Sequence, residues 1–145
     1  MSQNYFPHEY NASEDNKILE LRAEYGWEGY GVFWALIERM ARLETGAIDP
    51  ERIGGISVSL SIEKGKLSDI INRCLEIGLF YKDVKDLYRN KRITQHVEKM
   101  KSYEEHGRKG AKKRWSKHSD RGANRGANAD KIREDNKTML QRCDV

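Results

Sequence analysis

Large apolar residues almost disappear after residue 106, so any folded core is confined to the part of the chain before it. The 39 residues from 107 to 145 hold five of them: Trp115, Ile132, Met139, Leu140 and Val145. Such a segment buries too little apolar surface to offset the entropy lost on ordering. It also contains the sequence RGAN twice in succession, at residues 121–128. We therefore expect a domain over residues 1–106 and a basic, low-complexity tail over residues 107–145 that is disordered or a linker.

Within residues 1–106, apolar residues at helical spacing predict a series of short helices ended by glycine. The first begins near Asp15 or Asn16, and Ser61 is expected to cap the fourth. Between the second and third helices, Ala47 and Ile48 allow only a short edge strand. The predicted helices cover residues 16–25, 30–43, 50–60 and 61–77.

Two aromatic runs, residues 79–81 and 87–88, enclose a charged stretch and predict a β-hairpin. A further helix is expected over residues 94–105. The fold class is therefore mainly α with a small β-hairpin. The order of the elements is that of a winged helix-turn-helix followed by a basic helix and a disordered tail.

Charge is strongly segregated along the chain. Residues 1–81 carry 8 Lys and Arg against 13 Asp and Glu, whereas residues 82–118 carry 13 against 5. Basic charge gathered in one part of a chain is typical of a protein that binds a polyanion. The alternative is a solvated basic segment that only aids solubility.

In a winged helix-turn-helix, the helix after the turn enters the major groove of DNA. Here that helix is residues 61–77, and its candidate contacts are Lys64, Lys66, Ser68, Asn72 and Arg73. These side chains can bond to guanine, adenine or phosphate. The candidate phosphate contacts of the hairpin are Lys82, Lys85, Arg89, Lys91 and Arg92. Alternatively, residues 61–77 are a core helix with a solvated polar side, because Glu63 and Asp69 would repel phosphate.

Residues 107–117 form the sharpest basic signal, with six cations in eleven positions and no acid. Cations neutralise phosphates and release counterions, and Trp115 can stack on an exposed base. The alternative is a flexible basic tail without a dedicated target. The predicted DNA contacts in this run are Arg108, Lys109, Lys112, Lys113 and Arg114.

Catalytic and metal-binding patterns are missing from the sequence. The four histidines are scattered without a paired-ligand motif, and neither Cys74 nor Cys143 belongs to a CxxC pair. We read Cys74 as a core residue and expect no enzyme activity, no cofactor and no metal. No apolar run is long enough to span a membrane and no leader pattern is visible, so we expect a cytoplasmic protein.

Four stretches of the sequence are similar to a known family: YFPHEYNA at residues 5–12, KILELR at 17–22, YGWEGYGVFW at 25–34 and CLEIGLF at 74–80. They resemble the N-terminal winged-helix domain of phage and prophage replication-initiation proteins, a DnaD-like family often described as a domain of unknown function. The resemblance covers about residues 5–118. It implies binding of DNA near a phage origin, with the replicative helicase or its loader as partner.

The sequence thus predicts a DNA-binding protein of replication initiation that contacts duplex DNA through a winged helix and a basic tail. Two alternatives remain open, a transcriptional regulator built from the same parts and a protein-interaction adaptor whose basic tail is incidental. Self-association through residues 30–43, giving a homo-oligomer, is also open.

Overall fold

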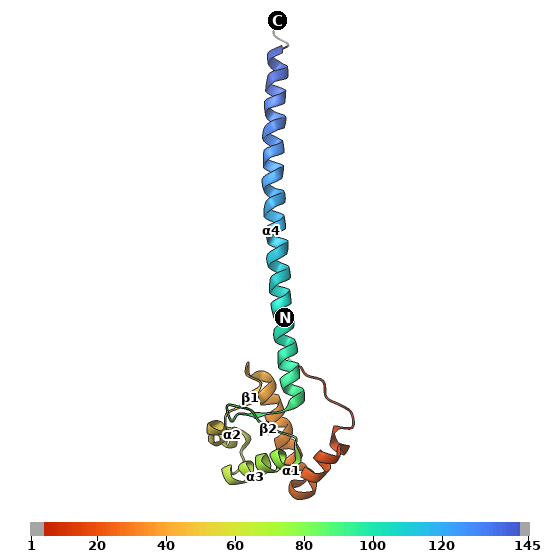
Figure 1. Ribbon diagram of the computed structural model, residues 1–145, viewed down its shortest axis with the longest axis vertical. Coiled ribbons are helices and arrows are strands. Elements are labelled where there is room, and N and C mark those ends of the chain that lie inside the picture. The colour runs from red at the N-terminus through yellow and green to blue at the C-terminus, as the bar shows by residue number, and fades with distance from the viewer. Residues whose placement is uncertain (1–4, 143–145) are drawn as a thin grey trace. The chain divides into compact units, whose positions relative to one another are not determined.

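The computed structural model describes the backbone of residues 5–142 and the side chains of residues 5–119. The chain divides into two compact units, Met1–Lys101 and Ser102–Val145. It is mainly helical, with one small antiparallel sheet of three strands (Figure 1). This confirms the expected fold class.

Helix α1 (Asn16–Arg42) follows a short 3-10 turn, Ala12–Glu14. The carboxylate of Asp15 accepts hydrogen bonds from the first free backbone N–H groups, as predicted for the cap. The helix is interrupted at Gly26, where φ is 61° and ψ is −153°. Side chains essentially exclude this conformation, so the predicted break at Gly26 is confirmed. The second half of the helix resumes directly after the break rather than at residue 30.

Strand β1 (Ala47–Ile48) is the predicted edge strand, and a 3-10 turn that starts at Pro50 leads into helix α2 (Ile53–Leu60). The expected cap at Ser61 is wrong. Ser61 has a left-handed conformation, φ 53° and ψ 40°, and its backbone N–H bonds to carbonyls of α2. The tight turn between the two helices requires this conformation, so Ser61 ends α2 instead of starting the next helix.

The N-cap position of helix α3 (Lys64–Ile77) is Glu63, two residues later than the predicted cap at Ser61. The helix ends at Gly78, whose φ of 86° favours glycine, as expected. The hairpin that follows is also confirmed. Strands β2 (Tyr81–Lys82) and β3 (Tyr88–Arg89) pair antiparallel, and β1 pairs with the other edge of β3.

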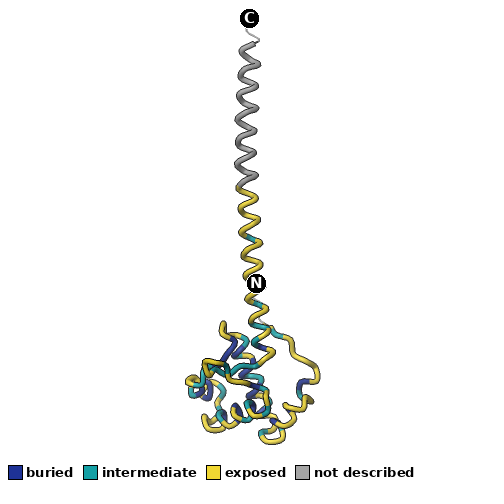
Figure 2. Tube along the Cα trace, viewed as in Figure 1, coloured by how far each residue is buried: buried dark blue, intermediate teal, exposed yellow. Residues whose placement is uncertain are grey.

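The core lies between α1 and α3, which pack on each other (Figure 2). Leu21, Leu36 and Met40 of α1 are fully buried. The rings of Phe33 and Phe80 stack at 5.5 Å and join α1 to the start of the hairpin. The predicted core stripe of α3 is buried as well: Leu67, Ile70, Ile71 and Cys74.

Cys74 is a core residue, as predicted from its place on the apolar side of its helix. It has no exposed surface, and burial raises the pKa of its thiol to about 12. A thiol with so high a pKa is not a nucleophile near neutral pH.

Helix α4 (Lys91–Arg142) begins where the side-chain oxygen of Asn90 accepts hydrogen bonds from the N–H groups of Arg92 and Ile93. It starts before residue 94 and does not end at residue 105. Residues 107–119 are helical, which corrects the expectation of a disordered segment there. A helix satisfies its backbone hydrogen bonds internally, and Lys, Arg and Ala favour it without a core. The RGAN repeat and the rest of the expected tail lie beyond the described side chains.

Candidate nucleic-acid interface

Three of the predicted contacts on α3 lie on one side of the helix. Lys64, Ser68 and Asn72 follow each other at intervals of four residues, which places them in one row. Lys64 and Asn72 are exposed and Ser68 is half-buried. Within the described part of the chain, no hydrogen bond or ion pair engages their side chains. This row is therefore free to meet a ligand.

The other two predicted contacts on α3 are bound to carboxylates. Lys66 forms an ion pair with Glu28 of α1. The guanidinium of Arg73 lies 3.2 Å from a carboxylate oxygen of Glu24 and 3.1 Å from one of Glu76. The hydrogen bond to Glu76, with the nearby carboxylates, raises the pKa of Arg73. The charges of Lys66 and Arg73 are thus compensated within the protein.

The carboxylate partners of Lys66 and Arg73 were not predicted from the sequence. Glu20, Glu24 and Glu28 recur every four residues, and Glu20 also lies 3.9 Å from Arg73. Glu20 and Glu24 lie before the break at Gly26 and form an acidic row there that is visible in the sequence, whereas Glu28 follows the break. Which cations face the row depends on how α1 packs on α3, and that information is absent from the local pattern.

In the hairpin, Arg89 stabilises the structure of the turn. Its Nε donates to Asp83 at 2.6 Å and its Nη1 donates to the carbonyl of Thr45 at 2.7 Å. The hydrogen bond from Arg89 also lowers the pKa of Asp83. These contacts hold β3 to its turn and to the segment before β1. Arg89 is therefore occupied and is not available to a phosphate.

The remaining predicted cations of the hairpin and of the start of α4 fall into two groups. Lys82 pairs with Asp86 at 3.7 Å, and Arg92 pairs with Glu9 at 3.3 Å. Lys85 and Lys91 are exposed, and in the described residues their ammonium groups have neither ion pair nor hydrogen bond. These two pairs lie at the surface and, unlike the pair of Lys66 with Glu28, include no hydrogen bond within the described residues, so Lys82 and Arg92 can still exchange partners with a phosphate.

The basic run on α4, residues 107–117, is exposed at every position except Ala111. We call the six cations of residues 108–117 the α4 cations. All six are exposed, no acidic residue lies among them, and none forms an ion pair within residues 5–119. Lys109, Lys113 and Lys117 form one row at intervals of four residues. The full set is Arg108, Lys109, Lys112, Lys113, Arg114 and Lys117.

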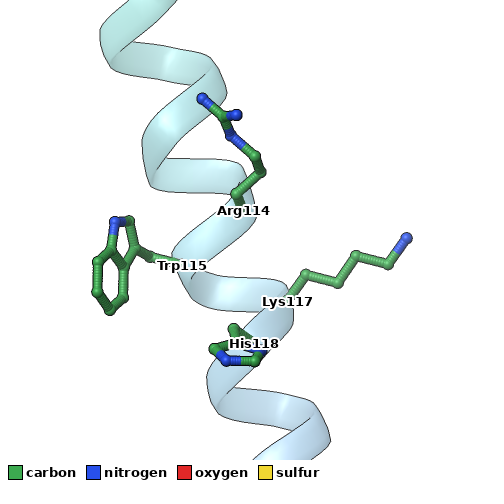
Figure 3. Close-up of a pocket in the computed structure, with 4 residues that line it drawn as sticks. All are labelled: Arg114, Trp115, Lys117 and His118. Atoms are coloured by element: carbon green, nitrogen blue, oxygen red, sulfur yellow. The ribbon is translucent and has the colours of Figure 1, made fainter.

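The side chains of Arg114, Trp115, Lys117 and His118 border a shallow concavity on α4 (Figure 3). A single helix supplies all of them, and they project from it in different directions. Such an open surface is unlike the enclosed, mostly apolar pockets that hold small molecules. No group of three His, Cys, Asp or Glu side chains that could hold a metal occurs among the described residues.

Comparison with known proteins gives one match. Residues 5–95 match the family model described as Lin1244/Lin1753-like, N-terminal. The chain belongs to this family. The Lin1244/Lin1753-like family has no known function, so the match does not test the resemblance to DnaD-like replication proteins. The Lin1244/Lin1753-like model ends at residue 95, so the α4 cations lie outside it.

No curated protein and no solved structure matches the chain. Across the residues that the structure describes, none of the helices is long and apolar enough to cross a membrane.

Proposed function

We propose that the protein binds duplex DNA, with α3 in the major groove and exposed cations of the hairpin and of α4 on phosphates. The observation that carries the proposal is the exposure of the α4 cations without any carboxylate among them. Duplex DNA is a dense row of negative charge, and each cation that meets a phosphate releases counterions. Counterion release supplies affinity for DNA but no preference for a base sequence.

Sequence preference is assigned to the row Lys64, Ser68 and Asn72. The order helix, strand, helix, helix, hairpin is the order of winged helix-turn-helix domains, in which the helix after the turn meets base edges. Lys donates to the acceptors of guanine, Asn pairs with adenine, and Ser bonds to either base. Lys64 lies in the first turn of α3, where side chains reach furthest into the groove.

The setting that we propose is initiation of phage or prophage replication in the cytoplasm. It rests on the resemblance of residues 5–12, 17–22, 25–34 and 74–80 to replication-initiation proteins. The replicative helicase or its loader is the corresponding protein partner. Selection of bound fragments from a phage genome distinguishes the settings, since enrichment of an origin supports replication and enrichment of promoter regions supports a transcriptional regulator.

The direct test compares Lys64→Gln with Lys66→Gln, two lysines on the same helix. Binding to a random duplex is measured by fluorescence anisotropy across a series of salt concentrations. Wild type should bind at low salt and weaken steeply as salt rises. On a random duplex, where Lys64 would meet a phosphate, Lys64→Gln should reduce the slope of log affinity against log salt by about 0.9. At a preferred site, where Lys64 would meet a base, it should cost about 1–3 kcal/mol.

Lys66→Gln is the matched control, because it removes the same charge from a lysine that a carboxylate already compensates. It should change the slope by less than half as much as Lys64→Gln does. Absence of binding by wild type at low salt would refute the proposed function. Equal effects of the two substitutions would refute the assignment of the α3 row.

A further inference from the structure

Trp115 is the most exposed of the tryptophans, with 76% of its surface accessible. It lies among the α4 cations, and within residues 5–119 no ring contact or hydrogen bond engages its indole. We propose that Trp115 is a stacking platform for an unpaired base of a single-stranded nucleic acid whose phosphates contact the neighbouring cations. This inference rests on the proposed function and extends it from duplex to single strands.

The local sequence leaves the indole open on the helix surface. The residues one turn before and after it on the same side are Ala111 and Ser119, both small. Helical side chains lean toward the N-terminus, so Trp115 lies over Ala111. Ala111 is the one side chain of residues 101–119 that is not exposed. No long side chain in these positions covers the rest of the ring.

Charge around the indole selects the ligand. Lys112 precedes Trp115 by three residues on the same side of the helix, and Arg108 by seven. Arg114 and Lys117 also border the concavity, but Lys117 projects from the opposite side of the helix, so the cations nearest the indole are Lys112 and Arg108 (Figure 3). An apolar protein partner would require further apolar side chains around the tryptophan, and residues 105–119 contain no other large apolar residue. A polyanion with accessible aromatic rings fits the combination.

A single strand satisfies this requirement better than a duplex does. In a duplex each base is stacked on its neighbours and presents only its edge, whereas an unpaired base exposes a whole face. Proteins that bind single strands combine a basic surface with aromatic side chains on which bases stack. Both single-stranded DNA and single-stranded RNA offer this chemistry.

Trp27 provides a matched control within the chain. It is also exposed, at 63%. However, the guanidinium of Arg22 lies over its ring at 3.7 Å, and the ring of Tyr30 contacts it edge-on at 5.6 Å. Its ring is occupied by the protein itself, and the nearest cation is engaged in that contact. Trp27 should therefore not accept a base.

The experiment uses the full chain and measures binding of oligo(dT), oligo(U) and a random duplex by fluorescence anisotropy. Trp115→Ala should weaken binding of oligo(dT) about tenfold, which corresponds to about 1.4 kcal/mol and falls within the range of base stacking. Its effect on the duplex should stay below about twofold. Trp115→Phe should lose less affinity for oligo(dT) than Trp115→Ala does, because phenylalanine keeps a stacking face. Trp27→Ala should bind all three probes with the affinity of wild type.

The outcomes separate this inference from the proposed function. If wild type binds the duplex and Trp115→Ala weakens every probe equally or none, the stacking role is wrong while duplex binding stands. If wild type binds no duplex but binds oligo(dT) through Trp115, the proposed function fails and the stacking role stands. If Trp115→Ala loses affinity for oligo(dT) alone, the site is specific for single-stranded DNA. If it loses affinity for both oligo(dT) and oligo(U), the site accepts unpaired bases of DNA and RNA.

Discussion

The row Lys109, Lys113 and Lys117 should control much of the salt dependence of DNA binding. The three lysines lie on one side of α4, and the eight-residue separation between Lys109 and Lys117 corresponds to about 12 Å along the helix axis. One backbone of a duplex can therefore meet all three. Replacing them together with glutamine removes three phosphate contacts and should reduce the slope of log affinity against log salt by about 2.7, at about 0.9 per contact.

This slope converts into a large change in affinity over an ordinary range of salt. A fourfold rise in salt, from about 50 to about 200 mM, weakens each phosphate contact about 3.5-fold and three contacts about 40-fold. Wild type should therefore lose about 40 times more affinity across this range than the triple glutamine variant does. Titration of a random duplex by fluorescence anisotropy, at four or more salt concentrations, measures both slopes.

The control replaces the same three lysines with arginine. It keeps the charge and the helical propensity of the segment, so its slope should equal that of wild type. The reasoning is refuted if the glutamine variant keeps the wild-type slope, since the row then contacts no phosphate. It is also refuted if the arginine variant loses the slope, because charge would then not be the cause.

Three further predictions concern the domain itself. Gly26→Ala should destabilise the protein by about 1–3 kcal/mol in urea unfolding, because φ is +61° at this position. Gly31→Ala, in a regular part of the helix with open space around it, should stabilise the protein by about 0.5–1 kcal/mol. Effects of the same sign would contradict this prediction. In a variant that lacks the other cysteine, Cys74 should resist thiol reagents at pH 8 until the protein unfolds, since burial raises its pKa to about 12; rapid labelling of the folded protein would show that its site opens. Asp83 has a lowered pKa because Arg89 donates a hydrogen bond to it, so its contribution to stability is complete above its ordinary value of 3.8 and is lost as pH falls through the folded value. Asp83→Asn should flatten this part of the stability curve, and an unchanged curve would remove Asp83 as its source.

Local signals were sufficient for most of the fold. Asp15, Gly26 and Gly78 fix a helix start, a break and a helix end through their own backbone or side-chain chemistry, and each was predicted correctly. Ser61 was wrong because a serine between two helices can end the first or start the second. The choice depends on the sharp turn that brings α3 against the core, and a pattern of single residues does not contain that turn.

The basic part of α4 shows the limit of arguing from apolar content. The low apolar density of residues 107–119 correctly indicates that they bury no core, since none of their side chains is buried. It does not indicate disorder, because a helix needs no core to pair its own backbone groups. Helix propensity and the burial of apolar side chains are separate quantities, and the prediction of disorder for residues 107–119 used only the burial of apolar side chains.

The candidate site could be predicted only as a set of cations, and the structure divides that set. Lys66 and Arg73 are cations on the same helix as Lys64, and the sequence alone does not distinguish the three. In the structure, however, carboxylates of α1 lie against Lys66 and Arg73. The deciding quantity is the rotation of α3 against α1. It follows from how Leu67, Ile70 and their neighbours pack in the core, and it does not appear in the charge pattern.

If α3 enters the major groove as proposed, the same ion pairs determine which side of α3 meets DNA. The flank that bears Arg73 adjoins the glutamates of α1, and a phosphate approaching there would meet carboxylates whose charge is already shared with that arginine. On the flank that bears Lys64 and Asn72, the exposed carboxylates of Asp69 and Glu76 lie near Asn72, but within the described residues no ion pair engages Lys64. Under the proposed function, we expect DNA to approach α3 on the side of Lys64 and Asn72 and not on the side of the α1 glutamates. Arg73 then acts on binding only by neutralising the glutamates, equally for all sequences, whereas Asn72 acts through the base that it meets.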